Sequence, residues 1–146
     1  MIPQEYLSMS ELDLRALCIW REAQGEGDLG KRGVGWTVQN RVENPGWWGH
    51  TAFGVILHPY QFSSFNANDP NHDKWPNDFD HSWLDCQLIA KDIMDDNDTD
   101  ITNGATHYHD TSMGWPAGWG DQSEYIHTLD VGHFKFYKFV GKSKGE

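Results

Sequence analysis

The sequence predicts an α+β fold that is mainly α, with a helical core and a small C-terminal β-hairpin. Two apolar segments that follow the helix-capping residues Ser10 and Asp80 indicate the main helices. Gly132-His-Phe-Lys-Phe136 alternates in polarity, which is typical of a half-buried strand. The chain of 146 residues has the usual size of one domain, so residues 1–146 are expected to form a single domain.

The first long helix is expected to begin after Ser10, whose hydroxyl can accept hydrogen bonds from the first-turn amides. Gly25 is a residue type that commonly ends helices. The residues between them are apolar around most of the helix circumference, which is typical of a helix at the centre of a core. Polar residues at its end, Glu22 among them, should therefore be held rigidly. The apolar residues are Leu12, Leu14, Ala16, Leu17, Cys18, Ile19 and Trp20.

A second helix is expected from about residue 28 to Val42, with Asn44-Pro45-Gly46 ending it. It contains Gly30, Gly33 and Gly35. A glycine inside a helix costs about 1 kcal/mol relative to alanine. Close approach of another helix would offset that cost, so this helix is expected to pack tightly.

Two more helices frame a long polar segment. Thr51 to Leu57 has the pattern of a short helix, and a longer helix is expected to follow Asp80 and to reach Met94. Residues 65–78 are rich in asparagine and contain two prolines. They are predicted to form a loop that is long enough to be a functional lobe.

The C-terminal part of the chain is rich in glycine, aromatic residues and histidine from residue 99 on. Residues 124–128 are expected to pair with residues 133–139 around a turn at Asp130-Val-Gly132. Residues 141–146 are expected to form a loose tail.

Charge and composition exclude several classes of partner. Eleven Lys and Arg against 22 Asp and Glu give a net charge of −11, without any run of basic residues, so nucleic acid is not an expected partner. No apolar stretch approaches the about 20 residues of a membrane helix, and residues 1–6 lack the pattern of a secretion signal. We therefore expect a monomer without membrane insertion.

The two cysteines, Cys18 and Cys86, lie far apart in the sequence and form no CxxC motif. A structural zinc site on them is therefore not expected. Both lie in predicted helices, which favours two buried free thiols. A single disulfide is the alternative.

Glu22 and Glu26 are the first candidates for catalysis. They are four residues apart and share one face if the helix continues through both. A glycoside-cleaving enzyme needs a carboxylic acid that stays protonated near neutral pH, which apolar surroundings and a neighbouring negative charge both favour. Glu22 also lies at a helix C-terminal end, where the helix dipole disfavours anions. A solvated surface pair is the alternative.

Histidines form a second candidate site. His107 and His109 share a face if they lie in a strand, and His127 and His133 lie on the predicted hairpin. A His-x-His pair can bind zinc when another strand supplies a third ligand, so a metallohydrolase is a competing interpretation. No His-Glu-x-x-His motif is present. Packing against aromatic residues or contact with substrate are the alternatives.

Aromatic and amide side chains are concentrated in predicted loops. Sugar rings have C–H faces that stack on aromatic rings and hydroxyls that amides bind, so the pattern indicates a carbohydrate groove. Filling of the core by large rings is the alternative. The residues are Trp47, Trp48, Tyr60, Gln61, Phe62, Phe65, Trp75, Trp115 and Trp119.

Four blocks of the chain, in the same order, resemble those of the SleB-like cell wall hydrolases, which include spore-cortex-lytic catalytic domains and their phage relatives. The first block combines Glu22-Ala-Gln-Gly-Glu26 with Val38-Gln-Asn-Arg-Val42, and the second is Tyr60-Gln-Phe-Ser63. The third and fourth are Ala105-Thr-His-Tyr-His109 and Val131-Gly-His-Phe-Lys-Phe-Tyr137. Each block alone is a weak signal, but their common order is strong evidence.

The resemblance implies a lysozyme-like or lytic-transglycosylase-like helical fold around a groove, and an enzyme that cuts the glycan strand of peptidoglycan. Glu22 would protonate the glycosidic oxygen between N-acetylmuramic acid (MurNAc) and N-acetylglucosamine (GlcNAc), without a metal or another cofactor. A lytic transglycosylase forms a 1,6-anhydro end, whereas a muramidase uses water. The alternative is a zinc-dependent peptidoglycan amidase or peptidase that uses His107, His109 and His133.

The resemblance also suggests substrate-binding residues: Glu26, Gln61, Phe62, Tyr108 and His109. The expected partner is the glycan strand of bacterial peptidoglycan. The absence of a signal favours a phage endolysin, made in the host cytoplasm and released to the cell wall by a holin-type protein, over a secreted bacterial enzyme.

The chain departs from the family pattern at Arg21, at Gln24 and at Ser64-Phe65. Arg21 matters most, because it stands where a small residue commonly precedes the glutamate. A cation beside Glu22 would favour the ionised carboxylate and oppose its work as an acid. The arginine side chain is therefore expected to point away along the helix if Glu22 is the acid.

Overall fold

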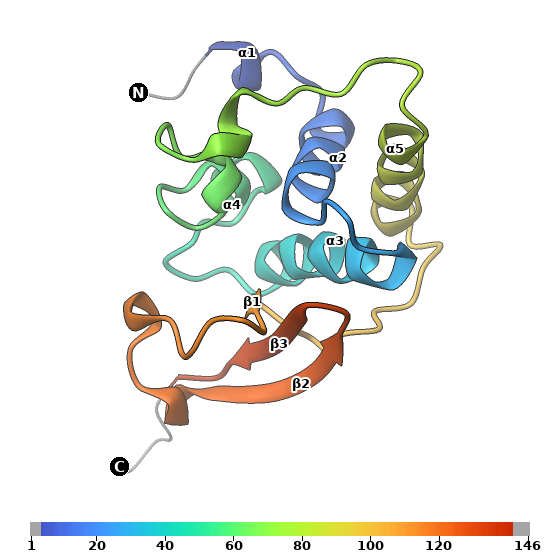
Figure 1. The fold of residues 1–146 in the computed structure, drawn as a ribbon. Coiled ribbons are helices and arrows are strands. Elements are labelled where there is room, and N and C mark those ends of the chain that lie inside the picture. The colour runs from blue at the N-terminus through green and yellow to red at the C-terminus, as the bar shows by residue number, and fades with distance from the viewer. Residues whose placement is uncertain (1–3, 142–146) are drawn as a thin grey trace.

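A computed structural model describes residues 4–141 as a group of helices above a three-stranded antiparallel sheet (Figure 1). The helices are α1 (Gln4–Leu7), α2 (Glu11–Glu22), α3 (Asp28–Glu43), α4 (Ala52–Leu57) and α5 (His81–Met94). The strands are β1 (His107–Asp110), β2 (Tyr125–Val131) and β3 (Phe134–Phe139). Short 3-10 turns are η1 (Ser63–Phe65), η2 (Pro70–Asp73), η3 (Ala117–Trp119) and η4 (Gln122–Glu124). The predicted mainly α fold with C-terminal β-structure is confirmed.

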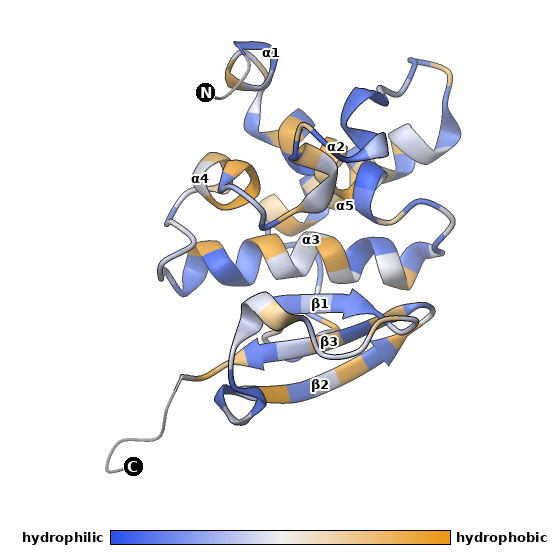
Figure 2. Ribbon diagram, turned by 60° about the vertical axis from the view of Figure 1, so that its left-hand side comes forward, coloured by the Kyte–Doolittle hydropathy of each residue, from blue (hydrophilic) through white to orange (hydrophobic). Residues whose placement is uncertain are grey.

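The helix caps predicted at Ser10 and Asp80 are formed, and Thr51 adds a cap that was not predicted. Ser10 Oγ accepts a hydrogen bond from the Asp13 amide at 3.1 Å at the start of α2. The Thr51 hydroxyl and the Asp80 carboxylate cap α4 and α5 in the same way. Hydrophobic residues of these helices gather where the helices meet (Figure 2). The central position of α2 is confirmed, since six consecutive residues, 14–19, are buried.

α2 ends at Glu22, which corrects the expectation that one helix face carries both glutamates. Residues 23–25 form a turn in which Gly25 has a φ of +79°, a conformation that favours glycine. The Glu26 amide donates to the carbonyl of Ala23 at 3.0 Å and closes this turn. Glu22 therefore belongs to the end of a helix, whereas Glu26 belongs to the segment after a turn.

α3 crosses the molecule between the other helices and the sheet (Figure 1). A Cβ atom at Gly35 would lie 2.7 Å from Cδ1 of Ile93 in α5, so the expected close helix contact is confirmed there. A Cβ atom at Gly33 would overlap the ring of Phe136 in β3. The expectation of a helix neighbour is wrong at Gly33, because the sheet, not a helix, approaches the backbone at that position.

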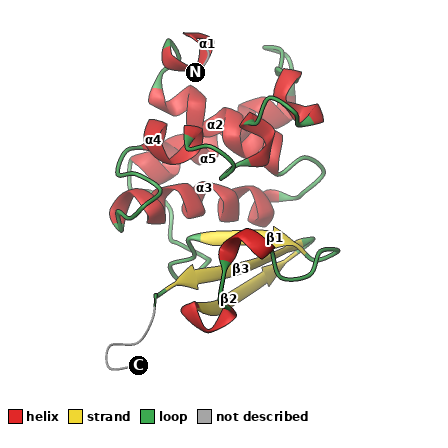
Figure 3. Cartoon of the chain, turned by 90° about the vertical axis from the view of Figure 1, so that its left-hand side faces the viewer, coloured by secondary structure: helices red, strands yellow, loops and turns green. Residues whose placement is uncertain are grey.

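The sheet has the strand order β1-β3-β2, so a third strand extends the predicted hairpin. β1 pairs with β3 in a register that places Tyr108 opposite Phe136 and His107 opposite Tyr137. Because side chains alternate along a strand, Tyr108 and Phe136 face the helices and His107 and Tyr137 face the other side. The loop that contains η3 lies over this other side (Figure 3).

Both thiols, Cys18 and Cys86, are free and buried, in agreement with the favoured interpretation. Within residues 4–141, no helix is long and apolar enough to cross a membrane. The predicted tail lies outside the described residues except for Gly141, whose amide donates to the carbonyl of Glu124 at 3.2 Å.

Candidate active site

The carboxyl group of Glu22 lies where three segments of the chain meet. Glu22 is the last residue of α2 and is partly exposed. Its Oε1 accepts a hydrogen bond of 2.6 Å from the Tyr108 hydroxyl of β1. Its Oε2 accepts a hydrogen bond of 3.0 Å from the backbone amide of Ser64 in η1. The helical core, the loop after α4 and the sheet thus fix the carboxyl group of a partly exposed residue.

The two donors constrain the proton of Glu22 differently. A hydroxyl can donate to a carboxylate and can turn to accept from a carboxylic acid, whereas an amide N–H can only donate. Oε2, which faces the Ser64 amide, is therefore favoured as the unprotonated oxygen. The proton of the acid form belongs on Oε1, beside Tyr108.

Tyr108 is embedded in aromatic side chains on the helix-facing side of the sheet. Its ring centroid lies 4.9 Å from that of Phe134 and 5.7 Å from that of Phe136. Burial, and then the neighbouring Glu22, raise the pKa of Tyr108 well above its usual range. The hydroxyl therefore keeps its proton and remains a donor to Glu22 throughout the neutral and mildly alkaline range.

The Arg21 side chain points away from Glu22, as the catalytic hypothesis requires. Its Nε donates to the carbonyl of Lys74 at 2.9 Å and its Nη1 donates to the Tyr6 hydroxyl at 2.8 Å. Only 1% of Arg21 is exposed, and its guanidinium lies against three aromatic rings. The departure from the family pattern at this position thus serves the packing of the loop segment that ends near Lys74.

Asn40 and Arg41 of the first block hold the start of β1. Arg41 Nε donates to the carbonyl of Thr106 at 2.6 Å, and Asn40 Nδ2 donates to the carbonyl of Ala105 at 2.9 Å. Burial lowers the pKa of Arg41 to about 10. Sequence reasoning gave these two residues no role, and the structure shows that they anchor the backbone next to Tyr108.

Gln61 and Phe62 lie beside Arg41. Gln61 is partly exposed, and its Oε1 accepts from Arg41 Nη1 at 3.2 Å. Only 2% of Phe62 is exposed, and its ring packs 5.3 Å from the Arg41 guanidinium carbon and 6.4 Å from the Tyr108 ring. Gln61 therefore lies partly at the surface, and Phe62 lies beneath the surface, as a support for Tyr108.

Glu26 binds the tip of the β2–β3 hairpin. Its Oε1 accepts from the His133 amide at 2.9 Å and lies 3.2 Å from His133 Nδ1. A Cβ atom at Gly132, whose φ is +54°, would lie 2.6 Å from Glu26 Oε2. Glu26 thus packs against Gly132, which has no side chain, and links the segment after α2 to the sheet.

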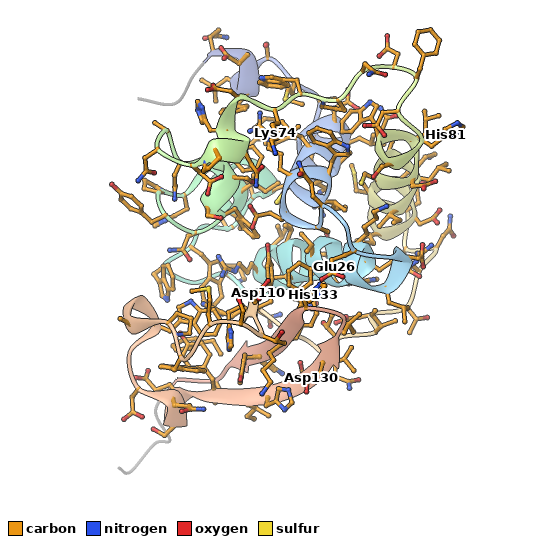
Figure 4. The ribbon with its side chains drawn as sticks, in the orientation of Figure 1. Glu26, Lys74, His81, Asp110, Asp130 and His133 are labelled. Atoms are coloured by element: carbon orange, nitrogen blue, oxygen red, sulfur yellow. The ribbon has the colours of Figure 1, made fainter. Side chains whose placement is uncertain are left out.

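Asp110 is a carboxylate near this hairpin tip that sequence reasoning did not select. Figure 4 shows Asp110 with His133 and Glu26 below the end of α2, and the Thr111 amide donates to the carbonyl of His133 at 2.7 Å. Hydrogen bonds from Ser112 lower the pKa of Asp110. Its spacing could have indicated it, since Asp110 is the second residue after Tyr108 and residues two apart in a strand lie on the same face.

The histidines of the competing zinc interpretation do not converge. His107 is 1% exposed among aromatic rings, and burial, followed by Arg41, lowers its pKa to about 3. The His109 ring stacks on Tyr137 with centroids 5.5 Å apart. His133 lies at the hairpin tip with Glu26. Within residues 4–141, no group of three His, Cys, Asp or Glu side chains could hold a metal ion.

The loop aromatic residues divide between core and surface. Trp48 is 4% exposed and packs in the core, whereas Trp47 is 53%, Tyr60 80% and Trp75 46% exposed. Trp115 and Trp119 pack with Tyr125 against the outer side of the sheet. Core filling is therefore confirmed for Trp48, whereas a carbohydrate groove formed by the exposed rings stays a prediction.

A model of the cell wall hydrolase family matches residues 25–137. The chain belongs to the cell wall hydrolase family. The matched segment contains Glu26, Gln61, Phe62 and the strand that carries Tyr108 and His109, and it begins just after Glu22. The assignment of Glu22 therefore rests on its geometry and on the sequence resemblance. A search of curated proteins finds no match for this cell wall hydrolase.

Two solved structures share the fold of this cell wall hydrolase. The catalytic domain of the Bacillus cereus SleB protein is 23% identical with a TM-score of 0.67, over 88% of this chain and 89% of that one. The catalytic domain of a germination-specific lytic transglycosylase, SleB from Bacillus anthracis, is 22% identical with a TM-score of 0.68, over 90% of this chain and 98% of that one. The predicted lysozyme-like helical fold is confirmed, with a three-stranded sheet in place of the hairpin.

Proposed function

We propose that this cell wall hydrolase cleaves the MurNAc–GlcNAc bond of peptidoglycan, with Glu22 as the general acid. The observation that carries the proposal is the carboxyl group of the partly exposed residue Glu22, held by the Tyr108 hydroxyl and the Ser64 amide. A carboxyl group that is fixed at a rigid helix end, on a partly exposed residue, is positioned for proton transfer to a bound substrate. Membership of the cell wall hydrolase family supports peptidoglycan as the substrate.

The proposed reaction needs one carboxyl group. Glu22 gives its Oε1 proton to the glycosidic oxygen as the bond between that oxygen and C1 of MurNAc breaks. The 6-hydroxyl of the same MurNAc then bonds to C1 and returns its proton to Glu22, so no water is consumed. Between these steps the Tyr108 hydroxyl stabilises the Glu22 carboxylate through its hydrogen bond.

The contacts of Glu26 and Asp69 support transglycosylation over hydrolysis. Glu26 is engaged by the hairpin tip, and Asp69, from the loop between α4 and α5, caps η2 by accepting from the Asn71 amide at 2.8 Å. Asp110 is the carboxylate that we infer would serve as the base if water attacked instead. The name lytic transglycosylase borne by the similar Bacillus anthracis domain also agrees with this choice.

Mass spectrometry of peptidoglycan digested in ¹⁸O-labelled water tests the proposal. We expect 1,6-anhydro-MurNAc ends without label, in the wild type and in Asp110→Asn alike. Labelled reducing MurNAc ends in the wild-type digest that disappear in Asp110→Asn would show that the enzyme hydrolyses the bond, with Asp110 as the base, and would contradict transglycosylation. Release of free peptides or of new amino groups, with intact glycan strands, would overturn the glycosidase and favour the amidase or peptidase.

We further propose that residues 1–146 act as one monomeric catalytic domain on glycan strands, and that the protein is a phage endolysin. The resemblance to phage relatives of the SleB-like enzymes supports the endolysin role. Expression in the cytoplasm of a bacterial host, with and without a holin, tests it. Lysis that requires the holin is expected, and lysis without it would contradict holin-type release.

A further inference from the structure

Arg21 and Glu22 are consecutive residues whose side chains bind the same loop residue from two sides. Nη1 of Arg21 donates to the carbonyl oxygen of Ser64 at 3.4 Å, and the amide of Ser64 donates to Oε2 of Glu22 at 3.0 Å. Arg21 therefore contacts the residue that supplies one of the two donors to the proposed acid.

The same guanidinium binds a second residue of this loop, Lys74. Nε of Arg21 donates to the carbonyl oxygen of Lys74 at 2.9 Å. Figure 4 shows Lys74 beside α2, and Lys74 directly follows η2. One buried side chain thus fixes residues 64 and 74 on the helix that ends at Glu22.

Three aromatic rings enclose the guanidinium. Its central carbon lies 5.5 Å from the ring centroid of Tyr6, 5.0 Å from that of Phe65 and 4.7 Å from that of Trp75. Phe65 and Trp75 belong to the same loop segment, so the cation–π contacts hold it at the points where the hydrogen bonds do. The segment is therefore restrained in both position and orientation.

The cation–π contacts favour a charged side chain at this position, but its hydrogen bonds offset little of the cost of burying the charge. The acceptors of its hydrogen bonds are all uncharged, and Nη2 is buried without a hydrogen-bond partner within the described part of the chain. A hydrophobic residue of similar size would avoid the cost of taking a charge out of water. A planar fork of donors, however, can reach two carbonyl groups at fixed angles, which an apolar side chain cannot do.

We propose that Arg21 is a positioning residue for the acid: it holds the segment from Ser64 to Lys74 so that the Ser64 amide stays bonded to Glu22 Oε2. The acid proton is thereby kept on Oε1, next to Tyr108. This inference rests on the proposed function, because it gives Arg21 its role through Glu22.

The test uses Arg21→Lys, which keeps the charge but not the fork, and Arg21→Met, which keeps neither. Arg15→Met is the matched control, because Arg15 is also a buried arginine of α2 but bonds to Glu11 and Gln39. On soluble glycan strands, both Arg21 variants should lose about tenfold to a hundredfold in kcat with little change in KM. Arg15→Met should keep its kcat for each folded molecule, as circular dichroism and Tm establish.

Two further readouts separate positioning from mere stability. Loss of the Ser64 donor favours protonated Glu22, so the alkaline limb of the kcat profile should move to higher pH in both Arg21 variants. In the wild type, the Ser64 amide proton signal in NMR spectra should titrate with Glu22, and in Arg21→Lys this response should be lost. The NMR measurement on Arg21→Lys needs only a folded chain, so it tests the proposal even if Arg21→Met does not fold.

A wild-type kcat profile and an unchanged Ser64 titration in Arg21→Lys would overturn the positioning role. An alkaline limb of the kcat profile that moves in Arg21→Met but not in Arg21→Lys would also overturn the positioning role, since the charge of Arg21 and not its geometry would then be the cause. Retained activity in Glu22→Gln is a different result: it would refute the proposed function itself. The two failures are therefore distinguishable.

Discussion

The hydroxyl of Tyr108 donates a 2.6 Å hydrogen bond to Oε1 of Glu22, and this contact joins the middle of β1 to the last residue of α2. The proposed acid belongs to the helices and its donor belongs to the sheet. The geometry of the site thus depends on how these two layers are placed relative to each other.

Glu22→Gln should abolish lysis of bacterial walls and leave the fold intact, because the amide has no acidic proton and nearly the same volume. We expect a loss of more than about a hundredfold in kcat, since general acid catalysis contributes about 10²–10⁴-fold. Glu43→Gln, at the last residue of α3, is the matched control and should behave as the wild type. Turbidity assays on purified walls measure both, and activity of Glu22→Gln above a few per cent would refute the assignment.

Tyr108→Phe keeps the ring in its aromatic surroundings and removes only the hydroxyl. A hydrogen bond to a charged group contributes about 1.5–3 kcal/mol, which corresponds to about a tenfold to hundredfold loss of kcat. Tyr125→Phe removes a tyrosine hydrogen bond on the other side of the sheet, from its hydroxyl to the carbonyl of Trp119 at 3.1 Å, and should keep kcat. Equal kcat values for the two variants would contradict a role of Tyr108 in the reaction.

Chelation separates the glycosidase from the zinc interpretation. Because His107, His109 and His133 lie apart, with different partners, we expect EDTA to leave activity unchanged. The measurement is the rate of release of soluble wall fragments before and after dialysis against EDTA. Loss of activity that added zinc restores would favour the metallohydrolase.

The burial of His107 should make the fold sensitive to acid. Its pKa is lowered to about 3, whereas an unfolded histidine has a pKa of about 6.5. Between these values the unfolded chain binds a proton that the folded chain does not, so stability falls as pH falls. Between about pH 6.5 and about pH 3 the free energy of unfolding falls by up to about 1.4 kcal/mol for each pH unit. Above about pH 6.5 the stabilisation by neutral His107 is fully present.

His107→Phe removes this titration, so its Tm should fall less steeply than that of the wild type between about pH 6 and about pH 4. His50→Asn, a change at an exposed histidine, should keep the wild-type slope. Thermal unfolding followed by circular dichroism gives the three slopes. Parallel slopes for the wild type and His107→Phe would show that His107 is not the cause.

Local patterns sufficed to predict α2, α3, α4 and α5, but they did not predict the single-turn helix α1. Ser10, Thr51 and Asp80 cap helices through side-chain bonds to amides within three residues, so the sequence contains the whole interaction. β1 was harder to predict, because a strand of four residues is stabilised by its pairing with β3. The paired residues, such as His107 and Tyr137, lie far apart in the sequence. Gly25 was expected to end the first helix, and it forms a left-handed turn after α2, whose last residue is Glu22. Glu26 follows this turn, so the expectation that it shares a helix face with Glu22 was wrong.

The candidate site was predicted only in part for a similar reason. Glu22 and Tyr108 could be found because their side chains define blocks of the resemblance. The Ser64 amide is a backbone donor, which any residue type except proline provides, so its role is invisible in the sequence. The direction of Arg21 depends on Tyr6, Phe65 and Trp75, which come together only in the folded chain.

The glycines of α3 have a consequence for how the molecule unfolds. With Gly30, Gly33 and Gly35 in its first half, α3 has a low intrinsic helix propensity and would not persist in isolation. Its helical state depends on the ring of Phe136 on one side and on Ile93 and Ile19 on the other. Melting of the sheet would therefore remove the support of α3, and loss of α3 would expose both neighbours. Unfolding should accordingly proceed as one cooperative transition, in which no half of the molecule survives the loss of the other.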